Sequence, residues 1–173
     1  MGKKINLTSY DNCFEASIKE NEKILKEIFE KYGCKINAIG HGTMENTVGR
    51  CEIDFLIELD DILVDNQFKK VLEELEYKYM GNDGIENRNV FLKTTGYPKV
   101  RIHFMPLNAS EAEYFKMVNY YLVNNKEAQK TYNKFKKHIN IQYPYNNIAY
   151  QESKNQYFLG LKTQIEKNLF SIL

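Results

Sequence analysis

The 173 residues, 43 % of them hydrophobic and only three of them proline, are enough to bury one core and exclude a disordered or low-complexity chain. The formal net charge of +1 hides an asymmetry, because residues 1–114 hold 15 Lys and Arg against 20 Asp and Glu, whereas residues 115–173 hold 9 Lys against 3 Glu. No apolar run approaches the roughly 18 residues of a membrane span, and residues 1–7 lack the apolar core of a signal peptide, so we expect a cytoplasmic protein with no membrane partner.

The first part of the chain alternates between strand and helix patterns. Residues 4–7 favour a short strand, and an N-cap at Asp11 followed by apolar residues at helical spacing predicts a helix that ends at Gly33. Strands are predicted at residues 35–39 and 52–59, on either side of a loop rich in glycine and small polar residues.

Helical periodicity returns at residues 66–79 and is followed by a turn cluster at residues 81–84. Two further strands are predicted at residues 89–94 and 99–105. The Gly-Tyr-Pro sequence at residues 96–98 joins them, so we expect these two strands to form a hairpin.

The rest of the chain shows helical patterns only, at residues 110–124, 126–139 and 147–171. This order of elements predicts an α+β fold in which a small mixed β-sheet is covered by helices and the C-terminal half is helical. We expect a single domain over residues 1–173, with a sheet-containing core at residues 1–106 and C-terminal helices at residues 107–173.

Two acidic residues share one face of the strand at residues 52–59. In Glu52-Ile53-Asp54-Phe55 the acids alternate with apolar residues, so both carboxylates point to one side while Ile53 and Phe55 enter the core. Two neighbouring carboxylates repel each other unless a cation lies between them, and hard oxygen ligands select Mg²⁺ or Mn²⁺. The pattern therefore favours a divalent metal site at Glu52 and Asp54.

The turn Gly40-His41-Gly42-Thr43 precedes these acids and favours phosphate binding. Glycine lets backbone N–H groups approach an anion, and His41 or Thr43 can add a side-chain donor. A metal site next to a phosphate turn suggests phosphoryl-group chemistry. An ordinary turn followed by a half-exposed strand explains the same residues, so both interpretations stay open on the residues alone.

The turn and the acids resemble the signature of the nucleotidyltransferase superfamily, and within it the chain is similar to the GrpB family. The family pattern of Ile-Gly-Ser-Thr, a basic residue and an aspartate matches residues 39–42, Arg50 and Asp54 without a gap. A second matching segment is Ile102-His103-Phe104, where the family has a His-x-His pattern. Further matches are Ser9-Tyr10-Asp11, residues 77–79, residues 81–85 with Arg88, Phe91 and Lys93, Tyr132 with Lys136, and Tyr150 with Lys154.

The chain departs from the family at several of these positions. His41 and Gly42 stand where the family has Ser and Thr, Arg101 stands at the first His of the His-x-His pattern, and Asn119 replaces an Arg. An alternative alignment that matches Gly42-Thr43 to the Gly-Ser pair keeps the hydroxyl but shortens the spacing to Asp54 by two residues.

The resemblance implies a nucleotidyltransferase that moves a nucleoside monophosphate from a nucleoside triphosphate to an unidentified acceptor hydroxyl and releases pyrophosphate. Glu52 and Asp54 would hold Mg²⁺ or Mn²⁺, and His103 would activate the acceptor. The residues expected around the nucleotide are Gly40, His41, Gly42, Thr43, Arg50, Arg88, Lys93, Lys136 and Lys154. Two other classes stay open. One is a nucleotide-binding or regulatory module that has lost catalysis. The other is a nucleic-acid-binding or partner-binding protein that uses the basic helices, although the spacing there mostly buries the aromatic residues and does not favour a stacking platform.

Overall fold

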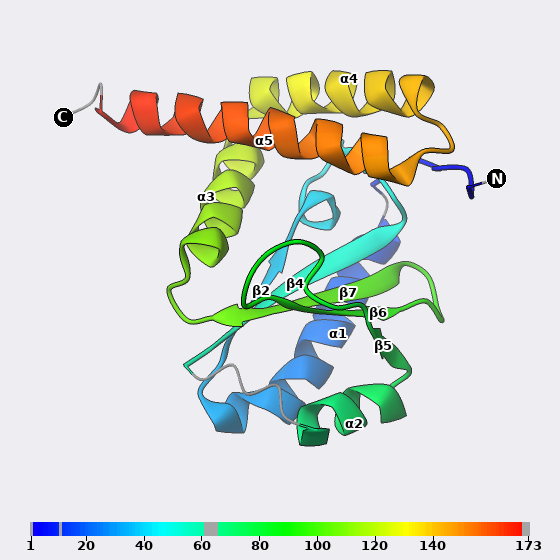
Figure 1. The fold of residues 1–173 in the computed structure, drawn as a ribbon, viewed down its shortest axis with the longest axis vertical. Helices are drawn as coiled ribbons and strands as arrows, with labels where there is room; N and C mark the ends of the chain where they lie inside the picture. Colours follow the sequence, from blue (N-terminus) through cyan, green and yellow to red (C-terminus); the bar gives the residue numbers. More distant parts are fainter. Residues whose placement is uncertain (1, 11, 61–65, 171–173) are drawn as a thin grey trace.

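A five-stranded mixed sheet organises the first half of the chain in the computed structural model, which describes residues 2–10, 12–60 and 66–170 (Figure 1). Across the sheet the strand order is β2-β4-β7-β6-β5, with β4 and β7 parallel and the other neighbours antiparallel. The strands are β2 (Lys35–Ile39), β4 (Glu52–Leu59), β5 (Tyr77–Tyr79), β6 (Asn89–Lys93) and β7 (Lys99–Pro106). A separate two-stranded ladder pairs β1 (Thr8–Ser9) with β3 (Val48–Gly49).

One face of the sheet is covered by α1 (Asn12–Phe29) and α2 (Asn66–Glu74), which lie below it in Figure 1. The alternation of β4 sends Ile53 and Phe55 into this layer, where both are fully buried. Phe104 of β7 completes the aromatic centre, with its ring centroid 5.2 Å from that of Phe29. Each such ring contributes about 1.5 to 3 kcal/mol by leaving water, so this layer holds the sheet rigid beneath its opposite face.

The opposite face lies under a layer of three helices, α3 (Ser110–Asn124), α4 (Lys126–Gln142) and α5 (Asn147–Phe170). Helices α4 and α5 run side by side, and α3 connects their layer to the sheet (Figure 1). Leu122, Tyr132 and Leu161 form the centre of their contact, and Asn125 caps α4 by accepting a hydrogen bond from the backbone N–H of Ala128. Among the described residues no helix is long and apolar enough to cross a membrane.

The predicted α+β class, the strands at residues 35–39 and 52–59, the hairpin and the three C-terminal helices are confirmed, although the second of these helices extends to Gln142. The predicted strand at residues 4–7 is wrong. There the N–H of Ile5 donates to Pro144 O at 2.8 Å, so this segment lies against the turn between α4 and α5, and the first strand begins at Thr8.

The helix predicted at residues 66–79 is wrong in its last part. It ends at Glu74, and Glu76 takes a left-handed φ of 67°, which turns the chain into β5. The predicted N-cap Asp11 and the predicted helix end at residue 171 lie outside the described residues.

Candidate functional site

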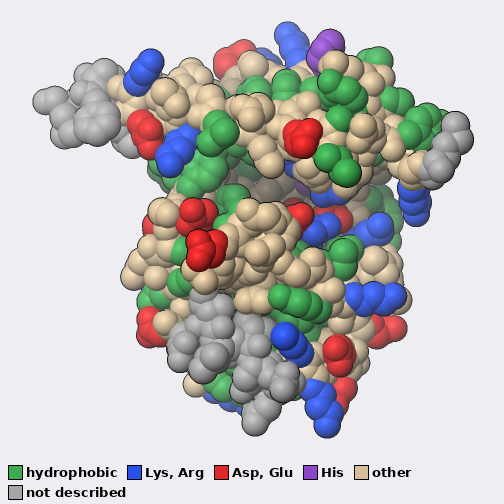
Figure 2. Space-filling view, in the orientation of Figure 1, with side chains coloured by type: hydrophobic (Ala, Val, Ile, Leu, Met, Phe, Trp, Pro, Cys, Tyr) green, Lys and Arg blue, Asp and Glu red, His purple; other side chains and the backbone are tan. Residues whose placement is uncertain are grey.

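Strand β4 places the carboxylates of Glu52 and Asp54 on the face of the sheet that is turned toward the helical layer. Ile53 and Phe55 point the other way into the core, as the alternation predicts. We call Glu52 and Asp54 the carboxylate ledge. Figure 2 shows acidic and basic side chains close together where the helical layer overhangs the sheet.

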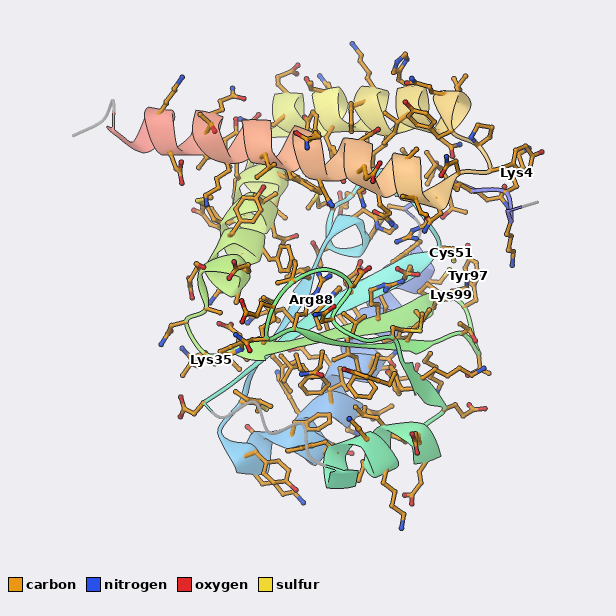
Figure 3. All side chains as sticks on the ribbon, viewed as in Figure 1. Lys4, Lys35, Cys51, Arg88, Tyr97 and Lys99 are labelled. Carbon is orange, nitrogen blue, oxygen red and sulfur yellow. The ribbon has the colours of Figure 1, made fainter. Side chains whose placement is uncertain are left out.

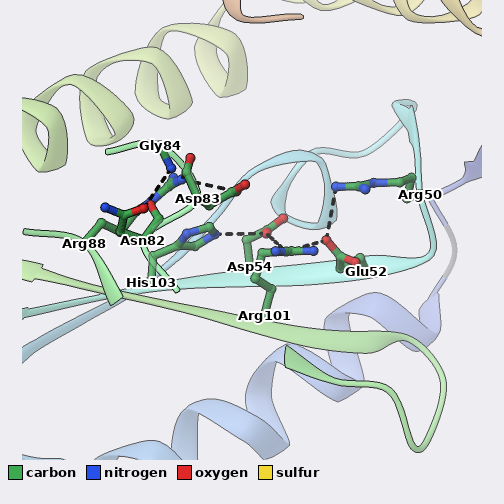
Figure 4. A network of polar contacts seen from close by, with 9 residues as sticks. All are labelled: Arg50, Glu52, Asp54, Asn82, Asp83, Gly84, Arg88, Arg101 and His103. Atoms are coloured by element: carbon green, nitrogen blue, oxygen red, sulfur yellow. Dashed lines mark hydrogen bonds and ion pairs between the residues drawn. The ribbon is translucent and has the colours of Figure 1, made fainter. Parts of the chain in front are cut away.

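The ledge converges on a common cation, and this cation is the guanidinium of Arg101 (Figure 4). Arg101 lies directly opposite Asp54 in the parallel ladder of β4 and β7. Its Nε donates to Glu52 Oε1 at 2.8 Å and lies 3.9 Å from Asp54 Oδ1. Arg50 adds a longer contact, with Nη2 3.4 Å from Glu52 Oε1. The repulsion between the two carboxylates is thus balanced within the protein.

His103 follows on β7 and contacts the other end of the ledge. Its Nε2 lies 3.3 Å from Asp54 Oδ1, whereas its Nδ1 is buried and has no hydrogen-bond partner among the described residues. Burial raises the pKa of Asp54, but the hydrogen bond with His103 and the charges of His103 and Arg101 outweigh it and lower the pKa to about 2. Asp54 is therefore ionised at neutral pH and is a weak base.

The glycine turn lies against the ledge. Gly40 has a φ of 79°, and a Cβ added there would lie 3.0 Å from Asp54 Oδ2, so only glycine fits without strain. The N–H of Gly40 donates to Asn119 Oδ1 at 2.8 Å, and the Thr43 hydroxyl donates to Gly40 O at 2.8 Å. The Thr43 hydroxyl is thus used inside the turn and the Gly40 N–H is used by Asn119 of α3, so Asn119 links the turn to the helical layer.

His41 does not point to the ledge. Its ring packs edge-on against Phe14, with centroids 5.6 Å apart, and a Cβ added to Gly49 would lie 2.3 Å from His41 Cδ2. Burial lowers the pKa of His41 to about 4, and the charges of Lys136 and Lys154 lower it as well. The imidazole is therefore neutral and packs in the interior, and Gly42 beside it is buried against Ile53.

Helix α5 brings Lys154 to the same region, together with Gln151. With its amide oxygen oriented toward Arg50, Gln151 accepts from both terminal guanidinium nitrogens at 3.0 and 3.2 Å. Lys154 has no hydrogen bond or ion pair with any described residue. Burial, and next the charge of Arg50, lower the pKa of Lys154 to about 8. A cation held in this way favours an anionic ligand.

Helix α4 adds Lys136, whose ammonium donates to Val48 O and lies 4.2 Å from the centroid of the Tyr132 ring. Burial, and next the charge of Lys154, lower the pKa of Lys136 to about 7. We call Arg50, Lys136 and Lys154 the cationic cluster.

Of the two remaining cations that the sequence places around the nucleotide, Lys93 lies away from the ledge, whereas Arg88 lies on the ledge side, within the electrostatic reach of Asp54 and Arg101. Lys93 pairs with Val100 and Tyr77 in the sheet and so lies on the face away from the ledge, with Nζ 3.8 Å from Glu76 Oε2. Arg88 belongs to the loop that rises over the sheet on the side of the helical layer (Figure 3). It donates to the backbone oxygens of Asn82 and Asp83 at 3.0 and 2.7 Å and thereby holds this loop together.

The ledge in this arrangement does not fit a divalent cation. A magnesium ion needs oxygen ligands at about 2.0 to 2.1 Å in an octahedral shell, and Glu52 Oε1 already accepts from Arg101 and faces Arg50. No group of three or more His, Cys, Asp or Glu side chains in the described part of the chain is arranged to hold a metal ion. The Mg²⁺ site stays a prediction from the sequence.

The family model described as GrpB protein matches residues 4–164. UPF0157 protein YqkA of Bacillus subtilis (strain 168) is 25 % identical over 158 residues, which cover 91 % of this chain and 44 % of that protein, so the chain spans less than half of its length. The crystal structure of the conserved protein GrpB from Enterococcus faecalis aligns with a TM-score of 0.82 and 21 % identity, over 95 % of this chain and 99 % of that one. The Cid1 poly(U) polymerase gives a partial likeness, with a TM-score of 0.48 and 15 % identity over 71 % of this chain and 40 % of that one.

Proposed function

This chain belongs to the GrpB family, and we propose on that premise that it binds a nucleoside triphosphate between α5 and the start of β4. The observation that carries the proposal is Lys154, a cation that has no hydrogen bond or ion pair with any described residue and lies in the electrostatic field of Arg50 and the ledge. We propose a nucleoside in the ligand because the chain resembles nucleotidyltransferases. We propose its phosphates because of the balance of charge around the ledge.

The balance of charge around the ledge favours a polyanion. Glu52 and Asp54 supply two negative charges, and Arg101 together with the cationic cluster supplies up to four positive ones. The ammonium groups of Lys136 and Lys154 repel each other, which is one cause of the lowered pKa of Lys136. The negative charge of a triphosphate would offset this repulsion and raise the pKa values of Lys136 and Lys154. Its binding should therefore be accompanied by proton uptake at pH 8.

Isothermal titration calorimetry tests the proposal with ATP, GTP, CTP and UTP, each in EDTA and in Mg²⁺. We expect binding of at least one triphosphate and an affinity about tenfold weaker in Lys154→Met, the loss of one charge-assisted contact. Lys167→Met on the exposed side of the same helix is the matched control and should bind as the wild type does. Absence of binding for all four nucleotides, or equal loss in both variants, would reject the proposal.

Nucleotidyl transfer is the second candidate function, and the contact between Asp54 and His103 is the observation that favours it. In such a reaction the acceptor oxygen bonds to the α-phosphorus, the bond from this phosphorus to the oxygen bridging to the β-phosphate breaks, and pyrophosphate leaves. The acceptor proton passes to a base. Because Nδ1 of His103 is buried and Nε2 faces Asp54, the imidazole positions the carboxylate in this arrangement and does not itself face an acceptor.

Labelling separates transfer from binding alone. The protein is incubated with α-labelled triphosphates and Mg²⁺ or Mn²⁺, and label on protein or added acceptors is measured together with pyrophosphate. Transfer predicts label that Asp54→Asn abolishes. Label that is unchanged in Asp54→Asn excludes this mechanism. Triphosphate binding without pyrophosphate release would instead identify a nucleotide-binding module that has no transferase activity.

A further inference from the structure

The position of Arg101 between the two carboxylates sets the metal chemistry of the ledge. From it we infer that Arg101 is the resident cation of the ledge and keeps divalent metal ions out of it. The inference concerns the protein without nucleotide, so it does not depend on the proposed triphosphate binding.

The sheet fixes Arg101 in this place. In the parallel ladder Asp54 lies opposite Arg101, and Glu52 lies opposite Lys99, so the side chain of Arg101 extends along the ledge toward Glu52. The distances of 2.8 and 3.9 Å from its Nε to the two carboxylates show that one guanidinium serves both. Burial lowers the pKa of Arg101, but the hydrogen bond and charge of Glu52 outweigh it and raise the pKa. The group is therefore charged at every physiological pH.

A metal ion would have to displace this guanidinium. The side chains of Arg101, Glu52 and Asp54 are 14, 8 and 21 % exposed, so the displaced cation would have little water to stabilise it nearby. A divalent ion placed beside it would also repel it. Because the guanidinium already donates to Glu52 Oε1 and forms an ion pair with Asp54 at 3.9 Å, a metal gains little by replacing it.

With Arg101 in place, the described His, Cys, Asp and Glu side chains form no group arranged for a metal ion. Removal of Arg101 would free three possible ligands to close around one. Glu52, Asp54 and His103 then remain on two adjacent strands, with His103 Nε2 3.3 Å from Asp54 Oδ1. Two carboxylates and one imidazole are ligands that Mn²⁺ accepts. The wild-type chain and a chain without Arg101 should therefore differ in metal affinity without any change in the other ledge residues.

Titration of the full chain with Mn²⁺, with free ion measured by electron paramagnetic resonance and no nucleotide present, tests the inference. We expect no stoichiometric binding by the wild type and one Mn²⁺ per chain in Arg101→Ala and in Arg101→His, about tenfold tighter or more than any wild-type binding. Arg101→Lys keeps a positive charge at this position and should resemble the wild type. Asp54→Asn combined with Arg101→Ala should lose the new site.

Two results would overturn the inference. The first is a wild-type chain that binds one Mn²⁺ and loses it in Asp54→Asn, and this arm needs no Arg101 variant to fold. The second is an Arg101→Ala or Arg101→His protein with a native near-ultraviolet circular dichroism spectrum that binds no Mn²⁺. Since the readout is metal binding without nucleotide, failure of triphosphate binding would leave the inference intact.

Discussion

Replacement of Lys136 by methionine should make the stability of the protein less dependent on pH. Lys136 is 2 % exposed, and its ammonium donates to Val48 O and lies above the Tyr132 ring. Burial, and then the charge of Lys154, lower its pKa from 10.5 to about 7. Methionine fills nearly the same volume without a charge, so Lys136→Met removes the titrating group and keeps the packing.

The magnitude follows from the linkage between protons and folding. Between pH 7 and 10.5 the unfolded chain holds a proton on Lys136 that the folded chain has released, so the free energy of unfolding rises with pH. Each pH unit within this window contributes about 1.4 kcal/mol. The stability of Lys136→Met relative to the wild type should therefore be higher at pH 6 than at pH 9, by about 2 to 3 kcal/mol.

Urea denaturation of both proteins at pH 6, 7, 8 and 9 measures this difference. Lys137→Met on the exposed side of α4 is the control, and its difference from the wild type should not vary with pH by more than about 0.5 kcal/mol. A stability difference between Lys136→Met and the wild type that stays constant across this range would refute the reasoning, because the ammonium would then keep its ordinary pKa in the folded protein.

Three further predictions concern neighbouring residues. Triphosphate affinity should fall as pH rises through about 8, because Lys154 loses its charge there, and titrations across this range should show no such step in Lys154→Gln. Gly49→Ala should lower the free energy of unfolding by about 1 to 3 kcal/mol, since the new methyl group meets the His41 ring, and the loss should shrink in the His41→Ser background; equal losses would contradict the packing. Arg88→Ala should speed proteolysis within residues 82–88, because this side chain binds the loop's own carbonyls, and unchanged cleavage kinetics would argue against that role.

The elements that sequence reasoning located best are those whose own residues determine them. In β4 the acids Glu52 and Asp54 alternate with Ile53 and Phe55, and the apolar run continues through residues 55–57, so the strand and the two faces at its start follow from periodicity alone. The hairpin follows from two β-rich runs around a Gly-Tyr-Pro turn. Both patterns are local, and no distant partner is needed to interpret them.

The missed elements depend on partners elsewhere in the chain. The spacing of Leu75, Tyr77 and Tyr79 suits a strand. However, this segment directly follows a helical pattern, and no glycine or proline separates the two patterns. Pairing of β5 with β6 and the left-handed Glu76 decide the outcome. The residues around Ile5 alternate as in a strand, yet the N–H of Ile5 donates to Pro144 O. Pro144 lies 139 positions away, so the periodicity of the local sequence could not predict this contact.

The site shows the same division between local and distant information. Sequence reasoning identified Glu52, Asp54 and His103 from two short motifs, and the structure brings all three together. It gave five cations one common role, because it had no means to order them in space. The face on which Lys93 lies depends on the register of β6 against its neighbours, and a shift of one residue would reverse it.

Arg101 is the residue whose interpreted role changes most once the pairing of the strands is known. Glu52-x-Asp54 on β4 and Arg101-x-His103 on β7 are alternating acids and alternating bases, and parallel pairing brings them to one face. Once two strands are known to be neighbours, such a match shows that the bases of one strand neutralise the carboxylates of the other without an external ion. A chain of this fold with both acids and a neutral residue at the position of Arg101 would lack that compensation. There a divalent metal would be the simplest cation to supply it, so a neutral residue at position 101 of this chain should open the ledge to metal.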